Sequence, residues 1–141
     1  MVVREFKEAD RTTLQRIYFE SRRDSFTWLD VESYKLDDFD KHTVGEKIWL
    51  GQVENEVVAF IAADIAENYI HHLFVLPSRT GNGYGSSLLN SCLEEIGRPA
   101  RLKCLSRNTP AVKFYKRLGW RTTAIGTDPR DGDYRLMEYE T

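Results

Sequence analysis

The feature that constrains this chain most is the order of three segments over residues 74–89: an apolar run, a glycine-rich loop and an apolar helical pattern. The apolar run ends at Pro77, and glycines then occupy the alternate positions 81, 83 and 85. This order predicts a strand, a tight loop and the first turn of a helix. Glycine permits positive φ and close approach of a ligand, and the free N–H groups at a helix N-terminus attract anions. The stretch therefore predicts a binding site for a phosphate or pyrophosphate group.

Two common nucleotide motifs do not fit this loop. No Lys-Ser or Lys-Thr pair follows the last glycine, as a Walker A loop requires. The glycines also lack the two-residue gap of a dinucleotide fingerprint, and no strand with an acidic end follows at the required distance. For the loop taken alone, a structural turn whose glycines only relieve crowding is the alternative.

Length and composition predict one domain, residues 1–141, that buries its own core, because 41% of the residues are hydrophobic and 30% are charged. A net charge of −2 lacks the basic excess typical of nucleic-acid binding, so we expect no nucleic-acid partner. Cys92 and Cys104 lie in a helical and a strand pattern and are interpreted as buried thiols in a reducing compartment. No signal-like N-terminus and no apolar run of about 18 residues is found, so we expect a cytoplasmic protein that does not enter a membrane.

Hydrophobic periodicity predicts an α/β chain of alternating elements. Residues 2–6 predict a first strand, residues 10–24 a helix and residues 30–39 a weaker helix. A hairpin is expected at residues 48–54 and 57–63, turning at Asn55-Glu56, and residues 69–76 form the next antiparallel strand. A helix from Gly83 to about Ile96 then leads by a right-handed crossover to a parallel strand at residues 101–105. A helix from Thr109 to Gly119 and strands at residues 120–125 and 134–139 close the chain.

A second stretch, residues 108–120, reads Asn-Thr-Pro-Ala-Val-Lys-Phe-Tyr-Lys-Arg-Leu-Gly-Trp. Together with the glycine loop, it closely resembles the GNAT acetyltransferase family, in its small single-domain bacterial form. The matching positions are Val75, Pro77, Gly83, Gly85, Leu88 and Leu89 in the first motif, and Asn108, Ala111, Phe114, Tyr115, Gly119 and Trp120 in the second. The resemblance is close in the second half of the chain and covers the first half only in its order of elements. It implies the GNAT fold: a mixed, mostly antiparallel sheet of six to seven strands with about four helices, whose central parallel strands splay apart.

The resemblance implies acetyl-CoA as the cofactor, with its pyrophosphate on the main chain of the loop and its pantetheine arm beside the strand at residues 69–76. Splayed strands leave backbone groups free for such an arm, and one N–H can polarise the thioester carbonyl. The expected cofactor-binding residues are Leu73, Phe74, Val75, Arg79, Thr80, Gly81, Asn82, Gly83, Tyr84, Gly85, Ser86, Asn108 and Tyr115. Thr80 stands where the family usually has Arg or Gln. Arg79 either supplies the missing charge or is simply solvated.

The implied activity is transfer of an acetyl group to a primary amine by direct attack in a ternary complex, for which no metal is expected. By resemblance, Tyr115 is the acid that protonates the thiolate, and its alternative is a core tyrosine. Asn108 is expected to cap its helix and, by resemblance, to contact the pantetheine. Glu67, His71 and His72 are the candidates for the base, with a water chain as the alternative. The two histidines are adjacent on a strand, which predicts opposite faces, with His72 on the face of Ile70 and Phe74.

Three aromatic residues between the first strand and the hairpin, Phe26, Trp28 and Tyr34, are the candidates for binding the acceptor. Acids at positions 37, 38 and 40 accompany them, which suits an apolar amine or a cationic group. Core aromatics and a solvated acidic face are the alternative interpretation. The acceptor is therefore a small-molecule amine or a peptide amine, either a lysine or an N-terminus. A non-catalytic acyl-CoA-binding module is the rival function, and a homodimer is expected from the resemblance alone.

Overall fold

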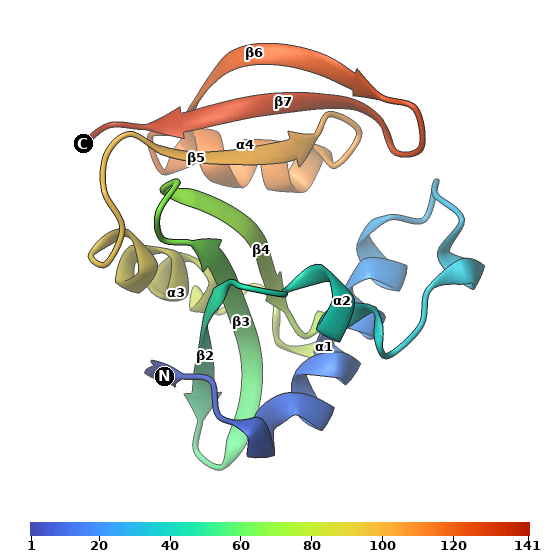
Figure 1. Ribbon diagram of the computed structural model, residues 1–141, viewed down its shortest axis with the longest axis vertical. Helices are drawn as coiled ribbons and strands as arrows, with labels where there is room; N and C mark the ends of the chain where they lie inside the picture. Colours follow the sequence, from blue (N-terminus) through green and yellow to red (C-terminus); the bar gives the residue numbers. More distant parts are fainter.

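The computed structural model describes residues 1–141 and contains one mixed sheet of seven strands in the order β1-β2-β3-β4-β5-β7-β6 (Figure 1). The strands are β1 (Val2–Glu5), β2 (Lys47–Val53), β3 (Glu56–Asp64), β4 (Tyr69–Val75), β5 (Ala100–Leu105), β6 (Arg121–Asp128) and β7 (Gly132–Tyr139). The α-helices are α1 (Arg11–Ser25), α2 (Asp38–His42), α3 (Tyr84–Leu93) and α4 (Thr109–Arg117), and short 3₁₀ turns η1, η2 and η3 span Glu8–Asp10, Val31–Ser33 and Pro77–Arg79. The predicted mixed, mostly antiparallel sheet with four helices is confirmed.

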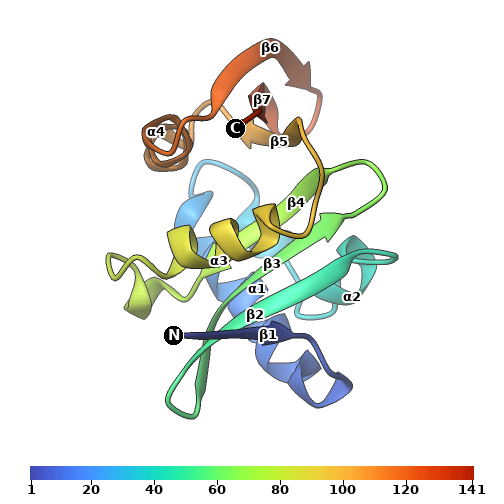
Figure 2. The same cartoon turned by 90° about the vertical axis from the view of Figure 1, so that its left-hand side faces the viewer.

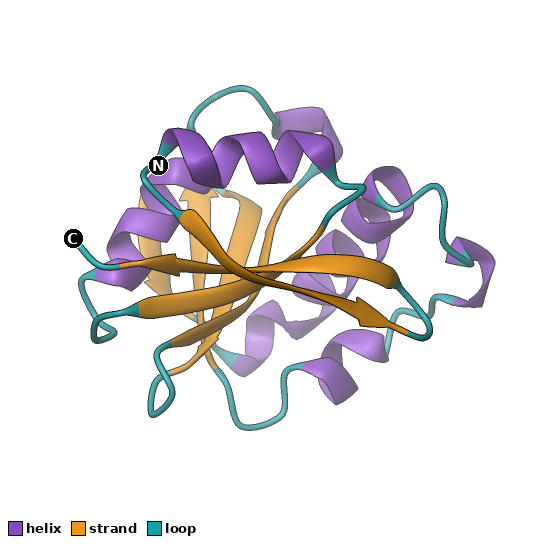
Figure 3. Cartoon of the chain, turned by 90° about the horizontal axis from the view of Figure 1, so that it is seen from above, coloured by secondary structure: helices purple, strands orange, loops and turns teal.

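Helices cover both faces of the sheet, α1 and α2 on one face and α3 and α4 on the other (Figures 2 and 3). The alternation of side chains along a strand explains this division. In β2, Ile48 and Leu50 pack in the cluster beneath α1, whereas Trp49 packs in the cluster beneath α3. The sheet is therefore buried on both faces at its centre, along β2 and β3.

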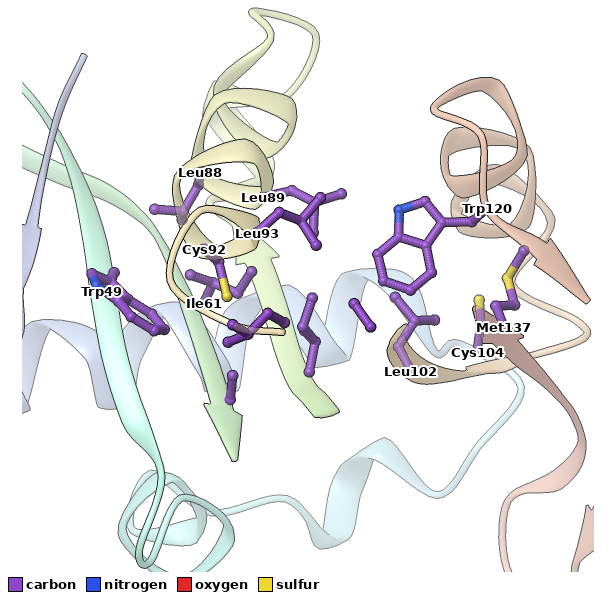
Figure 4. Close-up of a cluster of buried hydrophobic side chains, with 14 of the residues drawn as sticks. Trp49, Ile61, Leu88, Leu89, Cys92, Leu93, Leu102, Cys104, Trp120 and Met137 are labelled. Atoms are coloured by element: carbon purple, nitrogen blue, oxygen red, sulfur yellow. The ribbon is translucent and has the colours of Figure 1, made fainter. Parts of the chain in front are cut away.

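The hydrophobic cluster beneath α3 is the larger of the two, and it joins the two halves of the sheet. The predicted apolar face of α3 is confirmed, because Leu88, Leu89 and Cys92 have no exposed surface. Figure 4 shows this face packed over the strands, with Trp120 and Met137 continuing the cluster on the other side. Both cysteines, at positions 92 and 104, are free and buried, as predicted.

The parallel pair β4–β5 is short and then splays. Only Tyr69 and Ile70 pair with β5, opposite Arg101 and Leu102. Beyond them β4 continues to pair with β3 as far as Val75, so its other edge is left without a strand neighbour. Figure 1 shows β4 and β5 diverging from this point. The splayed parallel pair is thus confirmed, and it opens one edge of a central strand.

The predicted helix at residues 30–39 is wrong. The segment forms the 3₁₀ turn Val31–Ser33, an extended Tyr34 (φ −69°, ψ 143°) and then α2, which begins at Asp38. The Asp38 carboxylate accepts from the backbone N–H of Lys35, a local bond that competes with helical hydrogen bonding. The segment therefore runs as an irregular strap along the α1 face.

Other boundaries differ by a few residues. The hairpin turns at Glu54 and Asn55, one residue earlier than predicted, because Val53 pairs with Glu56 and Glu54 takes a φ of 56°. α3 ends at Leu93, and Ile96 follows in a turn that still buries its side chain. No helix in the structure combines the length and the hydrophobicity needed to cross a membrane.

Candidate active site

The glycine loop forms a cradle of unpaired amides at the start of α3. Gly81 and Gly83 have φ of 84° and 79°, values in the left-handed region that side chains disfavour. A Cβ at either position would meet no other atom of the protein within 4 Å, so both glycines border open space. The N–H groups of residues 80–86 make no hydrogen bond within the chain. These amides and the positive end of the helix dipole fit an anion.

A cavity of about 630 Å³ extends from this cradle along the open edge of β4 to α4. It is lined by every predicted cofactor-binding residue except one: Leu73, Phe74, Val75, Arg79, Thr80, Gly81, Gly83, Tyr84, Gly85, Ser86, Asn108 and Tyr115. The exception is Asn82, whose side-chain amide donates to the carbonyls of Arg79 and Thr80. Asn82 therefore stabilises the loop conformation and does not line the cavity. We call this space the loop cavity.

The backbone of β4 presents hydrogen-bonding groups to the loop cavity. Leu76 N–H donates to Val58 of β3, and alternate residues of a strand direct their groups to opposite edges. Leu73 and Val75 therefore direct theirs to the open edge. The hydroxyl of Ser21, which is buried on α1, already donates to the Val75 carbonyl at 3.1 Å. The N–H groups of Leu73 and Val75 remain for a ligand.

The second motif places two polar side chains opposite this edge. The Asn108 side chain accepts from Ala111 N–H at 3.4 Å, which confirms the predicted helix cap. Tyr115, partly buried, contacts the rings of Phe114 and Trp120, with centroids 5.1 and 5.8 Å away. Burial raises the pKa of Tyr115, so its hydroxyl keeps its proton throughout the neutral range. A protonated phenol on the cavity wall is a proton donor.

Thr80, which departs from the family pattern, still forms a hydrogen bond within the loop. The Thr80 hydroxyl donates to the Pro77 carbonyl at 3.2 Å and so closes the loop locally. The Arg79 guanidinium pairs with the Glu56 carboxylate across β3, which leaves it partly neutralised. Arg117, at the end of α4, is the other cation on the wall of the loop cavity, and it makes no ion pair within the chain. The cradle consequently relies on main-chain amides.

A second cavity of about 590 Å³ meets the loop cavity at Phe74, the one residue that lines both. We call it the aromatic cavity. Its walls come from α1, from the strap that joins α1 to β2 (residues 26–34 and α2), and from β4, β5 and the turn between β6 and β7. Among the predicted acceptor-binding residues, Phe26 and Tyr34 line it, whereas Trp28 stands behind Phe26 with ring centroids 5.8 Å apart.

The prediction that His71 and His72 face opposite sides of the sheet is wrong. Both line the aromatic cavity, and their ring centroids are 6.2 Å apart. The cause is an irregularity in the register: Ala62 pairs with His72, but the next residue of β3 pairs with Ile70, so β4 carries one extra residue. Ile70 therefore packs in the α3 cluster instead of sharing the face of His72.

His72 is the better placed of the two histidines. Its Nε2 lies 3.1 Å from the His42 carbonyl oxygen, which can only accept, so Nε2 carries the proton and Nδ1 keeps a free lone pair. Burial lowers the pKa of His72 to about 4, and the bond to the His42 carbonyl offsets this only in part. His71 is exposed, and burial lowers its pKa to a smaller degree. Glu67, in the exposed turn before β4, lines neither cavity.

Charged groups around the aromatic cavity are mostly neutralised by one another. The buried Arg22 lies between the rings of Tyr18 and Tyr34, 3.9 and 4.1 Å from their centroids, and pairs with Asp38 at 3.2 Å. Burial alone would raise the pKa of Asp38, but the Lys35 N–H and the Arg22 guanidinium outweigh it and leave the pKa lowered. The other two acids of the strap are also paired, Asp37 with Lys41 and Asp40 with Arg11.

Several residues that line the aromatic cavity, and Glu46 beside His72, escape sequence reasoning. Tyr18 and Arg22 are one helical turn apart on α1, a spacing that could have indicated a shared face. His42, whose Nδ1 lies 2.7 Å from the Tyr18 hydroxyl, and Glu46 follow no recognisable motif. They reach the site only because the strap folds back over α1. Neither has a signal in the sequence that would have identified it.

Comparison with known proteins agrees with this geometry. The model of the acetyltransferase (GNAT) family matches residues 11–120, and the chain belongs to that family. An uncharacterized N-acetyltransferase of Methanocaldococcus jannaschii is 28% identical over 134 aligned residues, which cover 72% of this chain. The chain spans 58% of the length of that relative.

Solved structures share the fold across the whole chain. The apo form of YjaB from Escherichia coli has a TM-score of 0.82 at 22% identity and covers 99% of this chain and 98% of its own. The PaiA N-acetyltransferase of Thermoplasma acidophilum, in complex with coenzyme A, has a TM-score of 0.81 at 17% identity and covers 99% and 98%. YncA of Salmonella typhimurium, a putative acetyltransferase solved with acetyl-CoA, has a TM-score of 0.71 at 18% identity and covers 99% and 93%.

Acetyl-CoA is the cofactor of this family, and the residues present fit it. The amides of residues 80–86 suit a pyrophosphate, and the open edge at Leu73 and Val75 suits the amide groups of a pantetheine arm. The loop cavity connects the two regions without interruption.

Proposed function

We propose that this protein transfers an acetyl group from acetyl-CoA to a primary amine held in the aromatic cavity, by direct attack in a ternary complex. One observation carries the proposal: the loop cavity, which suits an anion, and the aromatic cavity, which contains a neutral histidine, share the lining residue Phe74. Bound acetyl-CoA supplies a thioester whose carbonyl carbon accepts the amine. The residues of this chain supply alignment, charge stabilisation and proton transfer.

The main chain of β4 and the side chain of Tyr115 act on the thioester group of acetyl-CoA. The N–H groups of Leu73 and Val75 face the open edge, where either can donate to an oxygen on which negative charge develops. Tyr115 holds a proton that it gives to the departing sulfur. Asn108 orders the start of α4 and thereby the position of Tyr115 two turns later.

His72 acts on the amine side. An amine must lose a proton before it can attack, and His72 offers an unprotonated Nδ1 on the wall of the chamber. Because the pKa of His72 is lowered, the ring is neutral at any pH near 7 and is available as a base. The neighbouring His71, Tyr69 and Tyr34 line the same cavity.

The acceptor that suits the aromatic cavity is an amine attached to an apolar or aromatic group. Rings from Phe26, Tyr34, Tyr69 and Phe74 line the chamber. The strap acids that could have bound a second cationic group are committed to Arg11, Arg22 and Lys41. A small arylalkylamine is therefore favoured over a polyamine, and a peptide with an aromatic N-terminal residue is the corresponding macromolecular acceptor.

The test is a screen of amines with acetyl-CoA that follows release of the CoA thiol, preceded by calorimetric titration with acetyl-CoA. Arylalkylamines, polyamines, amino acids and peptides form the four arms of the screen. We expect acetyl-CoA to bind and arylalkylamines to be turned over at a higher kcat/KM than polyamines. Binding of acetyl-CoA without turnover of any amine would instead indicate a non-catalytic acyl-CoA-binding module. No binding of acetyl-CoA would overturn the proposal.

A further inference from the structure

Glu46, in the turn between α2 and β2, carries a carboxyl group that the activity described so far does not use. Only 10% of its side chain is exposed, and its Oε1 has no hydrogen-bond partner in the protein. A buried oxygen of this kind without a partner is uncommon and marks either strain or a function. The ring of His72 is close to this carboxyl group, with Nε2 3.9 Å from Oε1.

We propose that Glu46 is a positioning residue for proton removal: its buried carboxylate is the counter-charge that lets His72 accept a proton from the acceptor ammonium. The inference rests on the proposed function, and it adds a residue that no motif indicates. His72 Nε2 points at the His42 carbonyl and at Glu46, so Nδ1 is free to face the aromatic cavity. In this geometry the Nε2 side of His72 faces the His42 carbonyl and Glu46, and the Nδ1 side is left to act as the base.

Electrostatics explains why the two groups act as a pair. Burial opposes charge on either group alone: it lowers the pKa of His72 to about 4, and it raises that of Glu46 to about 7 with help from the negative charge of Asp64. A proton on the imidazole and a negative charge on the carboxylate compensate each other at 3.9 Å. A proton on His72 is therefore favoured when Glu46 is ionised.

Other groups around this pair do not replace Glu46. The charged or titratable side chains that face His72 are His42 on α2, His71 on its own strand, and Tyr18 and Arg22 on α1. The positive Arg22 and a protonated His42 or His71 would all oppose a proton on His72. Tyr18 stays neutral because burial raises its pKa, and Asp38 is held by Arg22. Glu46 is the one carboxylate within 4 Å of the His72 ring.

Two protons leave the acceptor nitrogen during the reaction. An N–H bond of the acceptor ammonium breaks and an N–H bond to His72 Nδ1 forms, so the amine nitrogen keeps its electron pair for attack. The positive charge now on His72 faces the negative charge on Glu46. When the new C–N bond forms, the nitrogen loses a second proton, which replaces the one that Tyr115 gives to the sulfur. No oxidant, reductant or metal takes part.

Histidine NMR tests the pair without any substrate. The chain has three histidines, so the imidazole signals can be assigned from His42→Gln, His71→Gln and His72→Gln variants. Because Glu46 ionises near pH 7 and its carboxylate then faces the His72 ring, we expect the His72 signals to shift with an inflection near pH 7 that is absent in Glu46→Gln. Glu46→Asp should restore part of the shift. Glu94→Gln, a charge change on the exposed end of α3, is the matched control and should leave His72 unchanged.

A pH–rate profile then connects the pair to catalysis. With an accepted amine, we expect kcat/KM of the unaltered protein to rise through about pH 7 as Glu46 ionises, and this rise to be absent in Glu46→Gln. Activity of Glu46→Gln at pH 8 should fall about tenfold with unchanged affinity for acetyl-CoA. The inference would be overturned if the His72 signals show no inflection near pH 7 in the unaltered protein, or if that inflection persists in Glu46→Gln. Loss of acetyl-CoA binding in the unaltered protein would overturn the proposed function and leave the NMR result to decide the pair.

Discussion

The two cavities that meet at Phe74 are built in opposite ways. The loop cavity takes its ligand groups from one continuous stretch of main chain, the amides of residues 80–86 and the open edge of β4. The aromatic cavity takes its groups from side chains on six separate segments. A main-chain site tolerates changes of side chain and fails when the backbone path changes. A side-chain site tolerates small backbone shifts and fails when a single group is removed or left unpaired.

The largest effect is expected at Tyr115, on the wall of the loop cavity. Replacing Tyr115 with Phe removes the proton donor and keeps the ring that packs on Phe114 and Trp120. We expect kcat to fall by about 10²–10⁴ while the affinity for acetyl-CoA stays within about twofold. Stopped-flow measurement of thiol release, together with calorimetry, separates the two quantities. An unchanged kcat with every accepted amine would remove Tyr115 from the mechanism.

The buried pair Arg22–Asp38 should show how strongly the aromatic cavity depends on single side chains. Arg22→Leu leaves the Asp38 carboxylate, 17% exposed, without its cation and removes the contacts with Tyr18 and Tyr34. We expect a loss of about 3 kcal/mol in unfolding free energy, measured by urea denaturation at pH 7. The double variant Arg22→Leu/Asp38→Asn should recover part of this loss. Equal stability of the two variants would show that the ion pair itself contributes nothing.

The loop cavity should respond to the backbone. Gly83→Val places a branched side chain at a φ of 79°, so the loop must leave the conformation that directs its amides inward. We expect affinity for acetyl-CoA to fall about 100-fold, by calorimetry, since several of these hydrogen bonds to a charged group would be lost together. Gly132→Val is the matched control, because Gly132 has a φ of 90° and open space around it but lies in the β6–β7 turn. If both variants weaken binding equally, general destabilisation is the cause.

The buried Glu46 should make stability depend on pH. Its pKa is raised from 4.5 to about 7 by burial, so the native state holds a proton that the unfolded chain releases above pH 4.5. The sign follows directly: Glu46 costs stability progressively as pH rises from about 4.5 to 7. Glu46→Gln should therefore raise the unfolding free energy at pH 8 by about 2 kcal/mol and change it little at pH 4. Thermal melts at the two pH values measure this, and an increase of equal size at both would contradict the assignment.

The smallest effect is expected at Thr80, the residue that departs from the family pattern. Its hydroxyl bonds only to the Pro77 carbonyl, and its N–H is what faces the cradle. Thr80→Ala should therefore change affinity for acetyl-CoA by less than about twofold, consistent with the modest net value of one exposed hydrogen bond. A much larger loss would show that this side chain, and not only the main chain, holds the ligand.

The contrast between the cavities also explains how far the sequence could predict the site. Motifs describe continuous stretches, and the loop cavity is made of two of them, so its predicted residues line it with the exception of Asn82. The aromatic cavity was predicted through Phe26, Trp28 and Tyr34, of which Trp28 lies outside it, while Tyr18 and His42 were missed. Glu46, which lies beside His72 and not on the cavity wall, was missed as well. Side chains that converge from distant segments leave no spacing to recognise.

The alternation of side chains along a strand also failed as a guide, because it depends on how the strands pair. Period-two reasoning assigned His71 and His72 to opposite faces, but one extra residue in β4 places His71 on the side of His72, so that both line the aromatic cavity. A bulge depends on how the neighbouring strands pair, which is settled when the sheet assembles. The predicted helix at residues 30–39 failed for a related reason, because local capping by Asp38 and packing over α1 decide the path of the strap.

The amino-acid sequence determines the acyl-CoA side of this protein, because glycines, proline and an amphipathic helix set the backbone path locally. It also determines the order of strands and helices and thereby the family. Tertiary structure decides the side where the amine is proposed to bind: the extra residue in β4 brings His71 beside His72, and the return of the chain after α2 buries Glu46 behind His72. Those positions follow from long-range packing, in which each group is placed by elements far from it in the chain.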